Sequence, residues 1–276
     1  MRDQAVPVGI NVNVPNAARM YDYYLGGDNN FPADREAAEK VLRIAPWIRA
    51  TALENRAFMR RAVSVLARDE GIRQFVDVGT GLPTRGNVHE VAHRAAPDAR
   101  VVYVDNDPVV LGHSRSLLSR VQNATTVRAD LRQPAGIIGH QDLTALIDWN
   151  VPVAVLLVAV LHFVTCDEDP AGIIGEFREV MAPGSYIVIS HLHHERRDES
   201  LRRVLAIYRN ASASLTARTS EQILRLFTGF DLLEPGLVPL QKWRPTSEPD
   251  PAEEIWGLGG VGRLQRATEE PAAAPS

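Results

Sequence analysis

Strand-like and helix-like segments alternate through the middle of the chain. Short apolar segments typical of strands occur at residues 75–78, 100–104, 125–128, 153–158 and 186–190. The segments between them carry helical patterns, and one begins at a proline suited to a first helical turn. Such alternation is typical of a parallel sheet whose strands are joined by right-handed helical crossovers. The sequence therefore predicts an α/β fold with a doubly wound, mostly parallel, seven-stranded Rossmann-like sheet.

The N-terminal part of the chain follows a different pattern. No strand pattern is found there, and helices are expected at residues 16–25, 34–45 and 51–67. A sheet of this kind needs no helices before its first strand. We therefore expect residues 1–70 to form an N-terminal helical cap on the sheet domain.

The C-terminal part completes the predicted sheet domain, which covers residues 71–266. Two more strands are expected at 230–238 and 255–264, although four glycines in the second weaken its strand pattern. Residues 267–276 are small, polar and rich in proline and alanine. Because such a segment cannot bury a core, it is predicted to be a disordered tail.

Charge and composition narrow the functional classes. The formal net charge is −4, which gives no attraction to a nucleic-acid backbone, and the single cysteine, Cys166, cannot form an internal disulfide. The most apolar run, residues 151–164, is too short to span a bilayer. The first residues also lack the apolar stretch of a signal peptide. These features predict a cytoplasmic protein without nucleic-acid or membrane partners.

A glycine-rich turn follows the first predicted strand. It contains Asp77, Gly79, Thr80 and Gly81, and the glycines let the backbone turn tightly beside a ligand. The third glycine of the dinucleotide fingerprint is absent. A carboxylate at Asp77 suits a ligand with ammonium and sulfonium groups better than a pyrophosphate. We expect these four residues and Thr84 to bind such a ligand, and Thr84 also to cap the helix that follows.

Acidic residues also end the second and third predicted strands. Asp105, which Asn106 follows, lies 24 residues after Gly81 and can accept both hydroxyls of a ribose. After the third strand, Asp130 can accept a hydrogen bond from an adenine amino group, and Leu131 can pack on the ring. The carboxyl ends of parallel strands meet at one edge of a sheet, so these residues predict a nucleoside-binding site there. Asp107 is expected to cap the helix that follows it.

The order of these segments resembles the class I S-adenosylmethionine-dependent methyltransferases. The resemblance is carried by DVGTG, VYVDNDP, RADLRQP, the strand end Leu161-His162-Phe163, and Ala182-Pro183-Gly184-Ser185. Two longer segments, PNAARMYDYYLGGDNNFPADR and GTGLPTRGNVHEVA, are similar to one group within that class. This is the bacterial "S-adenosyl methyltransferase" family, first described as a domain of unknown function. The likeness covers about residues 11–266, and it departs at Gly27-Asp28-Asn29-Asn30, where a lysine is expected.

The resemblance implies methyl transfer with S-adenosyl-L-methionine as cofactor, but it implies no particular acceptor. His162 is the titratable group best placed to act as a catalytic base or to be satisfied in the core rim. Tyr21 and Tyr24 share one helix face and can either line the cofactor pocket or pack in the core. We expect residues 11–34 to fold over the pocket as a lid, with Gly26-Gly27 as its flexible joint.

Two other functions stay open at this point. A nicotinamide-dependent oxidoreductase would share the sheet, the glycine turn and the ribose carboxylate, but Asp77 disfavours it. A protein that binds S-adenosylmethionine without catalysis is the second alternative. No Asn-Pro-Pro-Tyr segment follows the fourth strand, which favours a small-molecule acceptor over a flipped base. No metal site is predicted, because His191, His193 and His194 lack a ligand from a distant element. The oligomeric state is left open.

Overall fold

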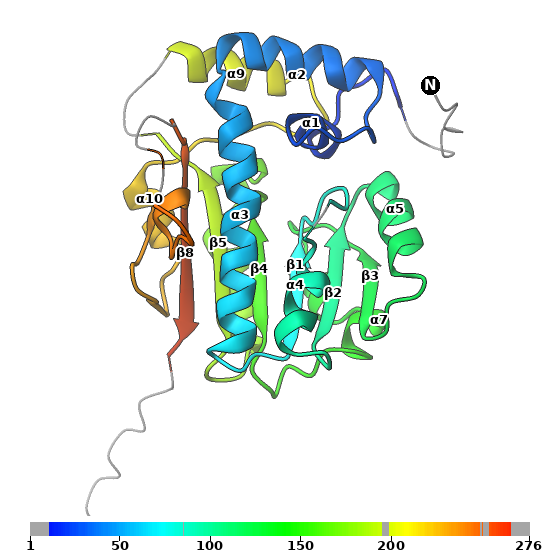
Figure 1. The fold of residues 1–276 in the computed structure, drawn as a ribbon, viewed down its shortest axis with the longest axis vertical. Coiled ribbons are helices and arrows are strands. Elements are labelled where there is room, and N and C mark those ends of the chain that lie inside the picture. Colours follow the sequence, from blue (N-terminus) through cyan, green and yellow to red (C-terminus); the bar gives the residue numbers. More distant parts are fainter. Residues whose placement is uncertain (1–10, 85, 195–198, 249, 251–253, 266–276) are drawn as a thin grey trace, which may run out of the picture.

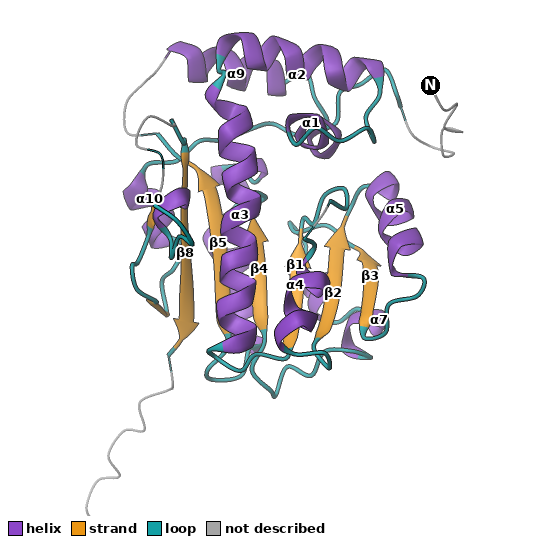
Figure 2. Cartoon of the chain, in the orientation of Figure 1, coloured by secondary structure: helices purple, strands orange, loops and turns teal. Residues whose placement is uncertain are grey.

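The computed structural model describes residues 11–84, 86–194, 199–248, 250 and 254–265. A mixed sheet runs through the molecule, with helices on both faces and a further group of helices across one end (Figure 1). Figure 2 shows the strands as one continuous layer. The strand order is β3-β2-β1-β4-β5-β8-β6, and β7 pairs with β8. The predicted doubly wound, mostly parallel fold is confirmed, with β7 as an additional two-residue strand.

Five neighbouring strands are parallel and form the half of the sheet that bears the predicted site. They are β1 (Gln74–Val78), β2 (Arg100–Asp105), β3 (Ala124–Arg128), β4 (Ala154–Val158) and β5 (Tyr186–Leu192). All residues of β1 and β5 are buried, as expected for parallel strands covered on both faces. The carboxyl ends of these strands therefore lie together at the edge that faces the end group of helices.

The last strand, β8 (Gly257–Leu264), runs antiparallel to β5 and lies between β5 and the short strands β6 and β7. Its glycines allow close packing against a helix on the sheet face. A Cβ atom on Gly259 would lie 2.8 Å from Cζ of Phe58, closer than real side chains approach. The glycines that weaken the strand pattern in the sequence therefore make room for the aromatic side chains packed on this strand.

The single strand predicted at residues 230–238 is wrong in extent. The structure has two strands there, β6 (Phe230–Leu232) and β7 (Val238–Pro239), and both pair with β8. A tight turn separates them, in which the backbone N–H of Gly236 donates to the carbonyl of Leu233 at 2.8 Å. The chain thereby returns to the same neighbouring strand.

Two apolar clusters cover the two faces of the sheet. One face carries α3 (Trp47–Arg68) and α4 (Val88–Ala95). The other face carries α6 (Pro134–Ile138), α7 (Gln141–Thr144), α8 (Pro170–Val180) and α10 (Ser220–Arg225). Helix α5 (Pro108–Leu118) packs against β2 and β3, and short 3₁₀ turns occur at η1 (Leu161–Phe163), η2 (Cys166–Glu168) and η3 (Leu240–Lys242).

Helix α3 joins the cap to the sheet. It is longer than the predicted 51–67 and crosses from the end group of helices along the face of β4 and β5 (Figure 1). Its first turns pack in the cap through Trp47 and Ile48, while Phe58 and Leu66 belong to the cluster on the sheet. The predicted boundary between the cap and the sheet domain, at residue 70, lies just after the end of this helix. The helix itself packs in both parts, so the cap and the sheet domain share α3.

The cap consists of α1 (Ala17–Tyr24), α2 (Pro32–Ile44), the start of α3 and α9 (Glu199–Tyr208). The contribution of α9 comes from a distant part of the chain. The predicted helix start at Asp34 is wrong, because α2 begins at Pro32. Asp34 instead accepts a hydrogen bond from the backbone N–H of Phe31 at 2.8 Å and forms a buried ion pair with Arg19 at 2.7 Å.

Within the described part of the chain, no helix combines the length and the hydropathy that a membrane span requires.

Candidate cofactor site

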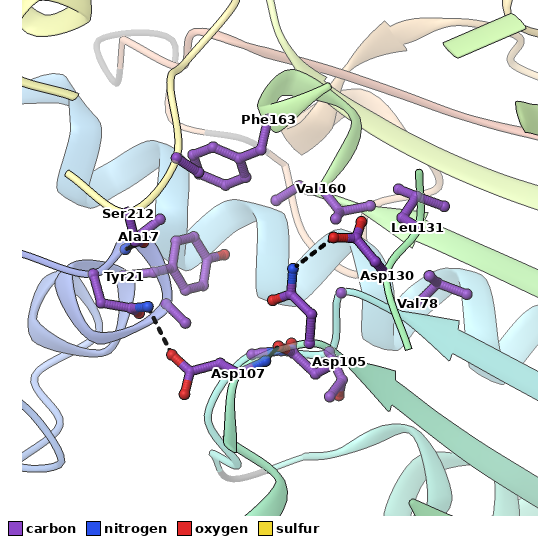
Figure 3. Close-up of a pocket in the computed structure, with 18 of the residues that line it drawn as sticks. Ala17, Tyr21, Val78, Asp105, Asp107, Asp130, Leu131, Val160, Phe163 and Ser212 are labelled. Carbon is purple, nitrogen blue, oxygen red and sulfur yellow. Dashed lines mark hydrogen bonds between the residues drawn. The ribbon is translucent and has the colours of Figure 1, made fainter. Parts of the chain in front are cut away.

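A cavity of about 420 Å³ lies between the carboxyl edge of the sheet and the cap. We call it the main cavity. In Figure 3, Asp105 and Asp107 approach it from the sheet side, while Tyr21 and Phe163 approach it from the cap and from the segment after β4. Its lining includes Asn16, Ala17, Tyr21, Asn55, Arg56, Asp77, Gly79, Thr80, Gly81, Asp105, Asn106, Asp130, Leu131, Ala159, Val160 and Phe163. Most of the residues predicted to bind a cofactor are thus brought to one place.

The glycine turn after β1 forms the floor of the main cavity. Gly79 has φ +71° and Gly81 has φ +65°, in the left-handed region that favours glycine. A Cβ atom on Gly79 would also lie 2.2 Å from Cγ2 of Val160, so the turn packs directly against the segment after β4. The hydroxyl of Thr80 donates to Asp77 at 2.9 Å and fixes that carboxylate beneath the turn.

Asp105 at the end of β2 is bound to the same turn. One carboxylate oxygen accepts from the backbone N–H of Gly81 at 3.0 Å, and the other accepts from that of Asp107 at 2.9 Å. Asp107 caps α5 by accepting from the backbone N–H of Val109 at 2.7 Å, which confirms the cap predicted there. The ribose carboxylate predicted from the sequence is therefore held in a fixed orientation beside the glycine turn.

Burial changes the acidity of the two inner carboxyl groups. Burial raises the pKa of Asp77 to about 6, against the opposing charge of Arg56 and the hydrogen bond from Thr80. Burial likewise raises the pKa of Asp105 to about 6, although backbone N–H groups oppose the shift. Both groups are ionised at pH 7, at a cost that a cation or a hydroxyl donor in the cavity would offset.

A third carboxylate stands at the outer edge of the main cavity. Asp130 follows β3 and accepts from the Asn106 side chain at 3.3 Å (Figure 3). Burial raises its pKa, but hydrogen bonds and charge from Arg132 outweigh that effect and lower the pKa below its usual value. Leu131 is buried next to it and presents an apolar surface to the cavity.

The sequence reasoning missed Arg56, one of three arginines that line the main cavity. Arg56 lies on α3, and its Nε and Nη2 atoms are buried without a hydrogen-bond partner among the described residues. A buried donor without a partner costs about 1–3 kcal/mol, so such groups call for an explanation. Arg56 is one of five arginines on α3, so nothing in the sequence distinguishes it, and only the packing of α3 beside the cavity places it in the lining.

The cap covers the main cavity through the start of α1. Asn16 donates from its side chain to Asp107 at 2.7 Å, which clasps α1 to the end of β2 (Figure 3). Tyr21 lines the cavity, and its hydroxyl donates to the carbonyl of Ala52 at 3.0 Å and accepts from the Asn55 side chain at 2.8 Å. The segment predicted to be a lid thus lies over the strand ends, with Tyr21 in the lining.

The turn after α1 is more tightly held than its glycine pair suggests. The Asp22 carboxylate accepts from the backbone N–H of Asn29 at 3.0 Å and from the Asn30 side chain at 2.9 Å. A Cβ atom on Gly27 would lie 2.1 Å from that carboxylate. These contacts favour a fixed turn over the flexible joint expected at Gly26-Gly27.

A smaller cavity of about 60 Å³ adjoins the main cavity and shares Ala17, Tyr21, Asn55, Ala159 and Phe163 with it. We call it the side chamber. Its other lining residues include Tyr24, Ile48, Ala52, His162, Tyr208 and Leu215. Tyr24 therefore lies outside the lining of the main cavity, and its buried hydroxyl is paired with that of Tyr208 at 3.2 Å.

His162, the predicted catalytic residue, lines the side chamber and not the main cavity. Burial, with smaller contributions from the nearby His191 and Arg218, holds its pKa well below the ordinary value. His162 is therefore neutral at pH 7. The backbone N–H of Leu192 approaches its Nδ1 at 3.4 Å, at the long limit of a hydrogen bond.

Arg218 supports the segment that carries His162. Its guanidinium donates to the carbonyls of Leu161 at 2.9 Å and Val164 at 2.8 Å, at the two sides of η1. It also donates to Nε2 of His191 at 2.6 Å, while Nδ1 of His191 contacts the carbonyl of Leu192 at 2.7 Å. Both ring nitrogens of His191 are engaged, so this histidine supports the loop.

The role predicted for Thr84 as the helix cap is wrong. Helix α4 begins three residues later, with Asn87 in the cap position. The left-handed backbone of Gly86, at φ +76°, extends the turn before the helix starts. Thr84 does not line the main cavity, and its buried hydroxyl has no partner among the described residues.

The fold and the site define a methyltransferase of the Rossmann-like class. The description "S-adenosyl methyltransferase" belongs to the family that matches residues 3–265, and the chain belongs to this family. Its cofactor is accordingly S-adenosyl-L-methionine. No curated protein matches the chain.

Two solved structures align over nearly the whole chain. A candidate methyltransferase from Thermobifida fusca is 40% identical, with a TM-score of 0.89 over 94% of this chain and 98% of the other. A DUF574 family protein from Streptomyces avermitilis is 38% identical, with a TM-score of 0.87 over 92% of this chain and 100% of the other. The mitomycin 7-O-methyltransferase MmcR, at 18% identity and a TM-score of 0.50 over 88% of this chain and 60% of the other, shows likeness of fold alone.

Proposed function

We propose that the chain transfers a methyl group from S-adenosylmethionine to a small molecule, with the cofactor in the main cavity. The observation that carries this proposal is the charge pattern of the lining. Carboxylates at the ends of three neighbouring strands and one unpartnered guanidinium face a single cavity. The cofactor carries an ammonium, a sulfonium, a carboxylate and a nucleoside, so each of these groups has a complement there.

Arg56 supplies the test of fit for the amino-acid end of the cofactor. Its buried Nε and Nη2 atoms lack a partner in the free protein, and a carboxylate would satisfy both with charge-assisted hydrogen bonds. The charge of Arg56 acts to lower the pKa of Asp77, so the two side chains interact. The Asp77 carboxylate complements the ammonium group of the cofactor, which lies next to the cofactor's own carboxylate. The residues present therefore fit the zwitterionic end of S-adenosylmethionine.

The nucleoside end fits the two outer strands. Asp105 uses one lone pair of each oxygen for backbone N–H groups, so further lone pairs remain for the two ribose hydroxyls. Asp130 and Asn106 hold polar groups at the place expected for the adenine edge, and Leu131 packs on the ring. Gly79 and Gly81 leave the backbone of the turn open to close approach.

The bound cofactor supplies an activated methyl group, so the protein mainly has to align the acceptor and exclude water. Tyr21 and Phe163 lie on the cap side of the main cavity and cover it with aromatic surface. Asn16 holds α1 in place by its bond to Asp107. His162 contacts the acceptor from the side chamber and is the proposed catalytic group.

The alternative functions have less support. The family is described as S-adenosyl methyltransferase, and the Thermobifida fusca match is described as a candidate methyltransferase, which does not favour a nicotinamide-dependent oxidoreductase. A protein that binds S-adenosylmethionine without catalysis shares the main cavity but needs no second cavity beside it. The adjoining side chamber therefore favours an enzyme.

Titration calorimetry with S-adenosylmethionine, S-adenosylhomocysteine and NADH tests the proposal. We expect both adenosyl ligands to bind and NADH not to bind. Asp105→Ala should weaken binding by about 1.5–3 kcal/mol, the usual value of hydrogen bonds to a charged group. Thr84→Val, which changes a residue outside the cavity lining, is the control and should bind normally. Binding of NADH alone would overturn the proposal. If the adenosyl ligands bind, a methyl-donor screen over small-molecule acceptors identifies the product.

A further inference from the structure

The side chamber adjoins the main cavity through residues that line both. Tyr21, Asn55, Ala159 and Phe163 line both cavities, so they form the junction between them. Ala159 has a left-handed backbone with φ +55°, a conformation that is uncommon outside glycine and that clusters at functional sites. The junction thus lies at the end of β4, beside the glycine turn rather than at the outer surface.

The junction is built from a continuous hydrogen-bond network. Asn55 on α3 donates to the Tyr21 hydroxyl at 2.8 Å and accepts from the hydroxyl of Ser190 on β5. Ser190 in turn accepts from the backbone N–H of Ala159 at 2.9 Å. The cap, α3, β5 and the segment after β4 are therefore fixed relative to one another at this point.

The side chamber presents no charged side chain to its contents. None of the residues that line it, within the described part of the chain, is aspartate, glutamate, lysine or arginine. His162 and His191 are its titratable imidazoles, and burial holds the pKa of each well below 6.5. Transfer of a charged group into such surroundings without a partner is costly. An uncharged occupant is therefore strongly favoured.

Aromatic and aliphatic side chains together form the walls of the side chamber and leave a small space. Phe163 and Tyr208 lie with ring centroids 6.2 Å apart, and Tyr24 and Tyr208 pair their hydroxyls at 3.2 Å. A water needs about 10–15 Å³ of such space. The volume of about 60 Å³ is smaller than the roughly 150 Å³ of a cavity that binds benzene, so the side chamber holds part of a ring and the remainder lies at the junction.

We propose that the side chamber binds the methyl acceptor, and that the acceptor is a small, uncharged phenol whose hydroxyl lies at the junction beside His162. This inference rests on the proposed function and adds the class of acceptor. A flat ring can pack against Phe163 and Tyr208, with its hydroxyl edge at the junction. An aliphatic amine or a carboxylic acid is charged at pH 7 and would lack a partner in the lining.

The transfer step balances with the groups that are present. The phenol oxygen bonds to the methyl carbon as the carbon–sulfur bond breaks, and the bonding pair stays on sulfur. The hydroxyl proton passes to the neutral imidazole of His162. The positive charge of the sulfonium is thereby replaced by that of the imidazolium, so the net charge of the two joined cavities is unchanged. This exchange lets a histidine that is neutral beforehand accept a proton despite its burial.

Ligand-detected NMR with phenol, benzoate, benzylamine and toluene, in the presence of saturating S-adenosylhomocysteine, tests the inference. We expect phenol to bind, with benzoate and benzylamine giving no signal. Toluene should bind about fivefold more weakly than phenol, because it lacks one hydrogen bond. The inference would be overturned if benzoate or benzylamine bound as tightly as phenol does. It would also be overturned if toluene and phenol bound with equal affinity.

Two variants test whether phenol binds in the side chamber. Ala52→Leu on α3 and Leu215→Trp in an irregular segment each add bulk to residues that line only this chamber. Both should abolish phenol binding and leave the affinity for S-adenosylhomocysteine within about twofold. Ala50→Leu changes a residue two positions earlier on the same helix that does not line the side chamber, and it is the matched control for Ala52→Leu.

The outcomes separate the two proposals. If S-adenosylhomocysteine fails to bind the wild-type protein, the proposed function falls. If it binds but phenol does not, or if phenol binds both variants normally, the assignment of the side chamber falls alone. The Leu215→Trp variant decides the matter if Ala52→Leu does not fold.

Discussion

The two inner carboxylates of the main cavity should make cofactor affinity depend on pH. Asp77 and Asp105 lie on neighbouring strands, and burial raises the pKa of each to about 6 in the free protein. In the proposed complex both act in the ionised form, one toward an ammonium and one toward ribose hydroxyls. Binding therefore lowers both pKa values, and affinity falls as the pH drops through 6.

The magnitude follows from the fraction of each group that is ionised. For a carboxyl group with a pKa of about 6, this fraction falls roughly tenfold between pH 7 and pH 5. Asp77 and Asp105 together therefore give a fall in affinity of about a hundredfold, or roughly 3 kcal/mol.

The same two groups affect the stability of the free protein in the opposite sense. Their folded pKa values lie above the ordinary value of 3.8, so the stability that they contribute is complete below that value and is lost as the pH rises through 6. As far as these two groups are concerned, weaker binding at pH 5 does not reflect unfolding.

Titration calorimetry with S-adenosylhomocysteine from pH 5 to pH 7 measures this effect. Asp105→Asn should bind more weakly at pH 7 and lose only about tenfold in affinity by pH 5, since Asp77 alone then titrates in this range. Asp130→Asn is the matched control, because the pKa of Asp130 lies below its usual value and the group stays ionised throughout. An affinity constant within twofold over this range in the wild-type protein would refute the reasoning. So would an unchanged pH dependence in Asp105→Asn.

Three further substitutions test other parts of the account. Gly79→Ala should destabilise the protein more than Gly81→Ala in chemical denaturation. At position 79 the new Cβ would lie 2.2 Å from Val160, whereas at position 81 only the left-handed strain of about 1–2 kcal/mol applies. Equal losses of stability in the two variants would argue against the packing described. Arg56→Met should weaken binding of S-adenosylhomocysteine by about 1.5–3 kcal/mol, and unchanged calorimetric affinity would remove its proposed role. His162→Phe should keep that affinity within about twofold while slowing methylation of phenol in a product assay, and normal turnover would show that His162 is dispensable.

The sheet and its ligand edge were predictable because they depend on local patterns. Buried parallel strands are apolar throughout, and acidic residues at the ends of β1, β2 and β3 stand out against them. Parallel pairing then brings Asp77, Asp105 and Asp130 to one edge whatever the details of packing. For this reason the main cavity contains most of the residues expected from the sequence.

The remainder depends on contacts between distant parts of the chain. Asn55 meets Ser190 across 135 residues, and Tyr24 meets Tyr208 across 184. No local pattern encodes such pairs, so the side chamber could not be foreseen and Tyr24 was expected in the main cavity. Thr84 was expected to cap a helix because the extra turn at Gly86 leaves no clear mark in the sequence.

The central claim is that the main cavity holds S-adenosylmethionine between the strand ends and the cap. A crystal structure of the protein with S-adenosylhomocysteine tests this most directly. The account predicts the ligand's carboxylate within hydrogen-bond distance of Nε or Nη2 of Arg56, and its ribose hydroxyls on Asp105. A ligand bound elsewhere, or one bound in the main cavity with Arg56 still unpartnered and Asp105 uncontacted, would contradict it.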